Sequence, residues 1–225
     1  MWNEEALAYA QQLAHPGTLA LALWQACVFH KLCRESQRVA KLAEAHIALA
    51  AEHGFPQALA SGEFDRGWVA ALAGRHDEGI AQMRRALAAG CATGAERGVS
   101  ASLGDLAETL GRAGETTEAL ARVAASGERW YEAELHRLKG EALLRLSGSD
   151  PTEAEACFRK AIAVAQEQEA NLWRLRAAMS LARLWCDHGK RAEAHNLLAP
   201  IYGWFTEGFD TSDLKETKSL LDTLA

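Results

Sequence analysis

Three groups of residues carry side chains suited to chemistry. The first lies in the stretch 131–146, YEAELHRLKGEALLRL, where His136 stands between Glu132 and Glu141. An imidazole beside carboxylates is an arrangement that general acid–base catalysis uses. The other two groups offer the thiol and imidazole ligands that zinc prefers, and they are Cys27, His30 and Cys33, and Cys186, His188 and His195.

The spacing of these groups favours structural roles. Steps of three residues rotate Cys27, His30 and Cys33 apart by about 120° in total along a helix, and no fourth zinc ligand lies nearby. Glu141 follows Arg137 by four residues, which is typical of an ion pair on a helix surface. No nucleophile stands near His136. We therefore predict no catalytic residue, no metal site and no cofactor, with a metal site or a helical-repeat enzyme as the less favoured alternatives.

Common catalytic motifs are absent from the sequence. No two glycines are separated by a single residue, which excludes the dinucleotide-binding fingerprint, and the sequence contains no G-x-S-x-G nucleophile elbow. The sequence contains neither a P-loop nor an H-E-x-x-H motif. This pattern supports a noncatalytic protein.

Composition limits the classes of partner. The 225-residue chain carries a formal net charge of -6, whereas nucleic-acid-binding proteins usually present a basic surface. The most apolar segment, LALALWQACVF at 19–29, is far shorter than the roughly 20 residues of a membrane span. Two acidic residues precede any apolar run, and the five cysteines show no paired spacing. We expect a cytoplasmic protein that binds neither nucleic acid nor membrane.

The elements that position these residues are predicted to be helices. Alanine and leucine dominate and β-branched residues are sparse, which favours an all-α fold. Apolar residues recur at helical spacing, as in Ala154, Phe158 and Ala161. Glycines lie in the turns between these segments, and we expect Gly74, Gly114 and Gly189 to end helices in the left-handed conformation.

Small residues recur upstream of the turns. Gly67, Ala107 and Ala182 precede the turn glycines, and Gly140 holds the matching place before the SGSDP turn. Glycine inside a helix costs about 0.5–1 kcal/mol relative to alanine, so these positions indicate helices that approach closely. The pattern resembles the tetratricopeptide repeat, with a somewhat longer period than its 34 residues.

The predicted architecture is one domain, 1–225, forming a right-handed superhelical solenoid of about five hairpins with terminal helices. The hairpins are expected at 17–53, 56–89, 96–126, 128–169 and 171–205, and a capping helix at 211–224. A first helix near 2–14 lacks a partner, which suggests an excised fragment whose apolar edge binds a second copy or an upstream domain. The glycine-rich stretch 88–98 is expected to be an ordinary loop, with a mobile seam as the alternative.

Repeats of this kind bind partners on a concave face lined by first-helix side chains around the small residue. Offsets from the small residues select Phe64, Trp68, Glu108, Arg137, Glu141, Arg176 and Arg183 as partner-binding candidates. Aromatic and arginine side chains often anchor interfaces. Phe64 and Trp68 either form an apolar patch or are buried by the neighbouring repeat. Arg176 and Arg183 either receive an acidic group or form an exposed solubilising stripe.

Whole segments resemble a more specific class of protein. They include RWYEAELHRLKGEALLRL, EAEACFRKAIAVAQEQEA and the C-terminal stretch through FDTSDLKE. These are similar to the C-terminal helical repeats of large bacterial signalling proteins that carry a nucleotide cyclase or kinase domain and a predicted ATPase module. The resemblance implies a regulatory or partner-sensing region. This chain contains no cyclase domain, and the lysine and asparagine carboxylate clamp of co-chaperone repeats is not reproduced.

The sequence therefore predicts a noncatalytic protein-interaction or regulatory module. Its partner is expected to be a protein segment or another domain of the parent chain, bound on the concave face. The main alternative is a small-molecule sensor that controls an attached ATPase, cyclase or transcription regulator.

Overall fold

The computed structural model describes residues 2–94, 96–111, 113–146 and 151–224. Within these ranges it contains twelve helices and no strand, which confirms the predicted all-α class. The helices are α1 Trp2–Gln12, α2 Pro16–Leu32, α3 Ser36–His53, α4 Pro56–Leu72, α5 His76–Ala92, α6 Val99–Leu110, α7 Ala113–Ser126, α8 Glu132–Arg145, α9 Pro151–Glu167, α10 Asn171–Asp187, α11 Arg191–Tyr202 and α12 Ser212–Leu224. None of the helices described has the length and apolar character of a membrane span.

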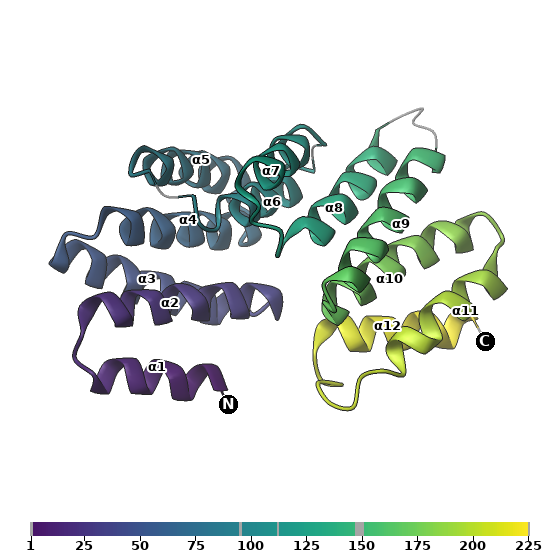
Figure 1. Ribbon diagram of the computed structural model, residues 1–225, viewed down its shortest axis with the longest axis horizontal. Helices are drawn as coiled ribbons and strands as arrows, with labels where there is room; N and C mark the ends of the chain where they lie inside the picture. The colour runs from purple at the N-terminus through teal and green to yellow at the C-terminus, as the bar shows by residue number, and fades with distance from the viewer. Residues whose placement is uncertain (1, 95, 112, 147–150, 225) are drawn as a thin grey trace. The chain divides into compact units, whose positions relative to one another are not determined.

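The chain divides into two compact units, Met1–Leu110 and Gly111–Ala225. The first unit contains α1 to α6 and the second contains α7 to α12 (Figure 1). The single repeat domain expected from the sequence stays a prediction.

In the first unit, α4 is the central helix. It packs against its sequence neighbours α3 and α5, and it also contacts α2 and α6, the first helices of the adjacent predicted hairpins (Figure 1). The core around it is formed by Val39, Phe64, Trp68, Met83, Ala86 and Leu106. A β-carbon added at Gly67 would lie 2.9 Å from the carbonyl oxygen of Gly79. The predicted need for a small residue at Gly67 is thereby explained, because the backbones of α4 and α5 meet there.

In the second unit, α10 has the corresponding place. It packs against α9 and α11 and contacts the first helix α8 and the capping helix α12. Phe158 of α9 is fully buried, and a β-carbon at Gly140 would lie 2.6 Å from its ring. Gly140 is therefore small because an aromatic ring, rather than a backbone, occupies the space beside it.

Most predicted boundaries lie within a few residues of the observed ones. The hairpins 17–53, 56–89 and 171–205 correspond to α2 and α3, α4 and α5, and α10 and α11. The hairpin 128–169 corresponds to α8 and α9, but residues 147–150 of its SGSDP turn lie outside the described residues. The pairing expected for 96–126 stays a prediction, since α6 and α7 belong to different units.

One turn glycine was assigned incorrectly. Gly74 and Gly189 have positive φ values of 89° and 75°, as predicted for residues that follow a helix. Gly114 lies in the first turn of α7, and Gly111, with φ 61°, takes the left-handed conformation instead. The sequence GRAG offers two glycines, and the helix before it ends at the first.

The stretch 88–98 is only partly a loop. α5 continues through Gly90 to Ala92, and the positive φ values fall at Gly94 and Gly98. A single glycine such as Gly90, preceded by alanines, is compatible with a helix at a modest cost in propensity.

Candidate functional site

The first unit contains a cavity of about 740 Å³. Its wall is built from the first half of α2, His46 of α3, the start of α4, and residues 93, 96 and 97 before α6. Small-molecule and peptide side-chain pockets usually lie between about 300 and 1,000 Å³. The cavity is thus large enough for a ligand or several side chains of a partner.

The wall combines apolar side chains with a polar rim. Leu21 and Trp24 of α2 and Phe55 before α4 supply apolar surface, and Leu21 is 45% exposed. Glu96 and Arg97 at the rim are both exposed and contribute one charge of each sign. This combination of an apolar surface with few polar groups is typical of binding sites.

His46 is the buried polar residue of the cavity wall. The residue is only 1% exposed, and Nδ1 of its side chain has no hydrogen-bond partner within the described residues. Burial lowers the pKa of the His46 imidazole, although the charge of Asp65 acts in the opposite direction. A neutral imidazole carries one N–H donor and one acceptor. The wall therefore includes a buried polar atom with unused hydrogen-bonding capacity.

Away from the cavity wall, the first helices of the first unit are joined by buried charges. Nζ of Lys31 on α2 lies 2.9 Å from Oδ1 of Asp65 on α4 and 2.7 Å from Oδ2 of Asp105 on α6. Burial lowers the pKa of the Lys31 ammonium, but Asp105 and Asp65 outweigh it and hold the pKa above its usual range. The ammonium thus stays charged and links three helices.

Sequence reasoning missed these charges. Asp65 and Asp105 each stand two residues before a small residue, Gly67 and Ala107. An acid repeated at the same place in consecutive repeats was the available signal. Nothing in the sequence indicated that Lys31, far upstream, would reach both.

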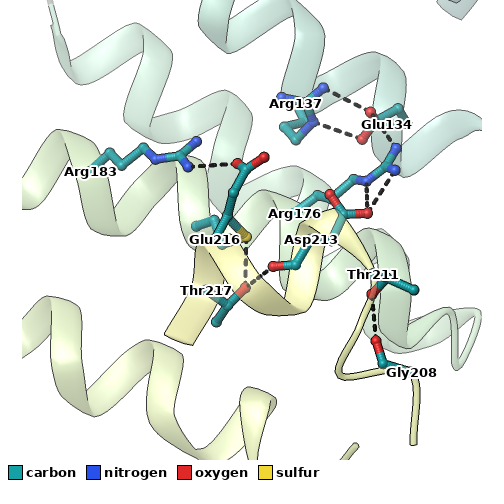
Figure 2. A network of polar contacts seen from close by, with 10 residues as sticks. Glu134, Arg137, Arg176, Arg183, Gly208, Thr211, Asp213, Glu216 and Thr217 are labelled. Atoms are coloured by element: carbon teal, nitrogen blue, oxygen red, sulfur yellow. Dashed lines mark hydrogen bonds and ion pairs between the residues drawn. The ribbon is translucent and has the colours of Figure 1, made fainter. Parts of the chain in front are cut away.

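In the second unit, buried arginines of the first helices α8 and α10 bind acids of α8 and α12. Nε and Nη2 of Arg137 each donate to Glu134 at 2.7 Å, and Nη1 donates to Glu141. On the next first helix, Arg176 donates to Oδ2 of Asp213 from Nε at 2.9 Å and Nη2 at 2.7 Å (Figure 2). Nη1 of Arg176 also lies 3.5 Å from Oε1 of Glu134, so Glu134 is shared by two arginines.

Further contacts extend this network along α10 and α12. Ser180 donates to Glu141 at 3.0 Å, and Arg183 pairs with Glu216 at 3.1 Å. Thr217 donates to the carbonyl oxygen of Asp213 at 2.7 Å, one turn earlier in α12 (Figure 2). The first helices α8 and α10 and the capping helix α12 are therefore connected by polar side chains.

The seven predicted partner-binding residues occupy different environments. Phe64 and Trp68 are buried in the first unit's core, which agrees with the alternative that neighbouring helices cover them. Arg137 and Arg176 are buried in ion pairs, Glu141 is partly buried, and Glu108 and Arg183 are exposed. Their binding of a partner stays a prediction.

Of the two alternatives for Arg176 and Arg183, an acidic group or an exposed stripe, both arginines contact acids of the chain itself, although Arg183 is exposed. Arg176 contacts Asp213 and Arg183 contacts Glu216, and both acids belong to α12. The seven-residue spacing indicated the shared face. It did not indicate that a later helix of the same chain supplies the acids.

The residues considered for chemistry do not converge. Within the described residues, no group of three or more histidine, cysteine or acidic side chains lies close enough to hold a metal ion. His30 Nδ1 lies 2.5 Å from Glu35, and Glu132 accepts from Arg129 at 2.7 Å. Burial also raises the pKa of the Cys27 thiol, so this group is protonated at neutral pH.

Comparison with known protein families finds no matching family model, and comparison with the curated proteins finds no match. The expected relation to bacterial signalling proteins stays a prediction.

Proposed function

We propose that the protein is a noncatalytic binding and regulatory module whose first unit takes a short segment of a protein partner in its cavity. In this proposal the helices form a right-handed superhelical solenoid of tetratricopeptide-like hairpins. The observation that carries the proposal is the cavity of about 740 Å³ lined by the first helices α2 and α4. Repeat proteins use first-helix surfaces of this kind for recognition.

The rim of the cavity supports a polypeptide segment as its occupant. Leu21, Gln57 and Arg97 all line the cavity and are all exposed, so the site is open to solvent along several elements. A chain can enter and leave such a site without unfolding the module. Apolar side chains of the segment would contact Leu21 and Trp24.

The proposed cellular setting rests on the net charge of the chain and on its resemblance to bacterial signalling proteins. A net charge of -6 supports a protein partner over nucleic acid. We place the module in the cytoplasm of a bacterium, as part of a signalling protein, with its partner segment on another protein or another domain of the parent chain. Tyr9 of α1 and Leu13, just after α1, are 69% and 60% exposed, and this edge is the proposed contact for a homodimer or an upstream domain.

Peptide selection tests the proposal. We would select peptides from a random display library on the full chain and measure their affinities for it by fluorescence anisotropy. Replacing the exposed cavity residue in Leu21→Asp should weaken binding at least tenfold. The matched control Leu72→Asp changes an exposed leucine of α4 outside the cavity wall and should leave affinity unchanged. If Leu21→Asp leaves the affinity of the peptides unchanged, or if both variants lower it equally, the proposed site is refuted.

A small-molecule sensor is the second candidate. It is favoured by the cavity volume and by an apolar wall with few polar groups. A metabolite present at 100 times its dissociation constant should stabilise the protein by roughly 2.7 kcal/mol. A thermal-shift screen of metabolites measures this, and a panel without any shift would count against the sensor.

A further inference from the structure

The connection between α11 and α12, residues 203–211, presents two aromatic rings to solvent. Trp204 is 60% exposed and Phe209 is 47% exposed. Trp204 packs against Phe205 in a T-shaped arrangement, with 5.2 Å between the ring centroids. Phe209 packs in the same way against Tyr202, at 5.9 Å. Because Phe205 and Tyr202 in turn pack on the core of the second unit, both exposed rings are attached to that core.

Hydrogen bonds fold the connection into tight turns. The N–H of Phe205 donates to the carbonyl oxygen of Tyr202 at 3.1 Å. The N–H and the hydroxyl of Thr211 both donate to the carbonyl oxygen of Gly208, at 2.9 and 2.6 Å (Figure 2). Aromatic side chains on an ordered backbone lose little conformational entropy when they bind, so these rings are suited to contact a partner.

Two other tryptophans of the second unit are each covered by an arginine that pairs with an acid. The two sets are Trp173, Arg176 and Asp213, and Trp185, Arg159 and Glu155. In both sets the guanidinium carbon lies 5.2 Å from the ring centroid, and the arginine contacts the acid at 2.7 and 2.8 Å respectively. A guanidinium is attracted to the face of an indole ring. Trp130 instead packs against Tyr131.

Trp204 has acids nearby in the chain but lacks the arginine. Glu207 and Asp210 are exposed, and their carboxylates make no ion pair or hydrogen bond within the described residues. In the same part of the chain, no cation lies over the ring of Trp204 or Phe209. Lys215, the nearest cation in the sequence, pairs with neither acid. The arginine that completes this set must therefore come from another molecule or segment.

The unpaired acids determine the kind of partner. They favour a cationic ligand, and they disfavour the anionic surface of a bilayer, to which exposed tryptophan rings could otherwise bind. Arginine suits the position better than lysine, because its planar guanidinium stacks on an indole and also donates hydrogen bonds to a carboxylate. Arginine and tryptophan are also frequent anchors of protein interfaces.

We propose that the connection 203–211 is a second interaction surface, which binds an arginine-containing basic segment of a protein partner. The guanidinium stacks on Trp204 and pairs with Glu207 or Asp210, while an apolar residue of the segment contacts Phe209. This surface belongs to the second unit and is separate from the cavity of the first.

A pair of peptides tests the need for a guanidinium. One is a short acetylated peptide with an arginine on each side of a leucine, and in the other citrulline replaces both arginines, which removes the charge and keeps the shape. We would titrate each into the full chain up to millimolar concentration and follow the indole N–H signals by NMR. The arginine peptide should bind at least fivefold more tightly and shift the signal of Trp204. Equal affinities, no binding, or a shift confined to Trp24 in the cavity wall would overturn the inference.

Removal of one ring tests the position. Trp204→Ala should weaken binding of the arginine peptide at least tenfold and, because the ring is exposed, leave the melting temperature nearly unchanged. Phe29→Ala is the matched control, since Phe29 of α2 is an aromatic residue of comparable exposure in the other unit, and it should leave affinity unchanged. If the two variants bind the peptide equally well, Trp204 is not part of the site.

The acids are tested as a pair. Glu207→Gln combined with Asp210→Asn should weaken the arginine peptide at least tenfold and leave the citrulline peptide unaffected. The control combines Glu153→Gln with Asp187→Asn, which removes the same charge from exposed acids elsewhere in this unit and should lower affinity less than twofold. Equal losses would mean that net charge alone attracts the peptide, and the assigned site would be wrong.

Two further measurements distinguish this partner from other occupants of the surface. Analytical ultracentrifugation should give the same mass for the full chain and its Trp204→Ala variant. Self-association that depends on Trp204 would show that a second copy covers the rings. Sedimentation with phosphatidylcholine vesicles should also be the same for both proteins, and binding that depends on Trp204 would assign the rings to a lipid surface. Either dependence would overturn the basic segment as the occupant.

Discussion

The first-helix surfaces of the two units are built from similar helices but differ in what their side chains do. In the first unit, the starts of α2 and α4 leave a cavity, and the buried charges lie elsewhere, at Lys31. In the second unit, arginines of α8 and α10 bind acids of α8 and α12. The difference lies in the side chains of the first helices, which bind acids in the second unit and leave a cavity in the first.

The buried cations of the two units also differ. Lys31 contacts Asp65 and Asp105, whereas Glu134 in the second unit is bound by both Arg137 and Arg176. Breaking a buried pair by removing one partner usually costs about 3–5 kcal/mol, because a charge remains buried without compensation. We therefore expect substitutions of the two cations to have unequal effects.

The largest effect is expected for Lys31→Met. It removes the ammonium from two acids with low exposure and should lower the free energy of unfolding by about 4–5 kcal/mol. Urea denaturation followed by circular dichroism measures this loss. Lys218→Met, which breaks an exposed pair with Asp222, is the control and should leave stability nearly unchanged. Equal stability of the two variants would show that Lys31 does not hold the three helices together.

Arg176→Met should have a smaller effect, of about 3 kcal/mol. Oδ2 of Asp213 loses its two hydrogen bonds from Arg176, but Glu134 keeps two hydrogen bonds from Arg137. The same denaturation experiment gives the comparison. If Arg176→Met lowers the free energy of unfolding more than Lys31→Met does, the remaining Arg137 does not compensate Glu134 as expected.

Alanine at two interface glycines should distinguish backbone contact from ring contact. A β-carbon at Gly79 would lie 2.5 Å from the Gly67 carbonyl oxygen and 2.6 Å from the Ala71 nitrogen, so Gly79→Ala should cost about 2 kcal/mol. At Gly140 the nearest atoms belong to the Phe158 ring, and side-chain torsions adjust more readily than a helix backbone, so Gly140→Ala should cost about 1 kcal/mol. Thermal unfolding of both variants tests the order, and the reverse order would show that the ring is the more rigid neighbour.

The smallest effect concerns pH. Because burial lowers the pKa of His46, the unfolded chain takes up a proton near pH 6.5 that the folded chain does not. Stability from this group is complete above pH 6.5 and falls below it, by at most about 1.4 kcal/mol per pH unit. His46→Phe should therefore lose less stability than the parent between pH 7 and pH 5.5 in urea denaturation. Parallel pH profiles would mean that His46 is protonated in the folded state.

The sequence predicted the helices better than the site. Gly74, Gly189, Gly67 and Gly140 were identified because turns and close helix contacts restrict local residue choice. The error at Gly114 arose because two glycines lie within one turn of each other, and either one can end a helix. Local patterns therefore sufficed for the elements and most of their boundaries.

The cavity was not predictable in this way. Its wall joins α2, α3, α4 and the residues before α6, and no local spacing relates these segments. In the sequence alone, His46 is indistinguishable from an ordinary polar residue of an amphipathic helix, and only the structure shows that it is buried. Likewise, the acids that face Arg176 and Arg183 come from α12, and their pairing depends on how α10 and α12 pack.

Hydrogen exchange of the full chain with and without a selected peptide tests whether the first unit holds the binding surface. We expect new protection at 17–24, 55–61 and 93–97, which contain the cavity wall of α2, α4 and the residues before α6. Protection confined to 134–141, 176–183 and 213–217 would contradict it, because the peptide would then bind where arginines and acids already join the helices.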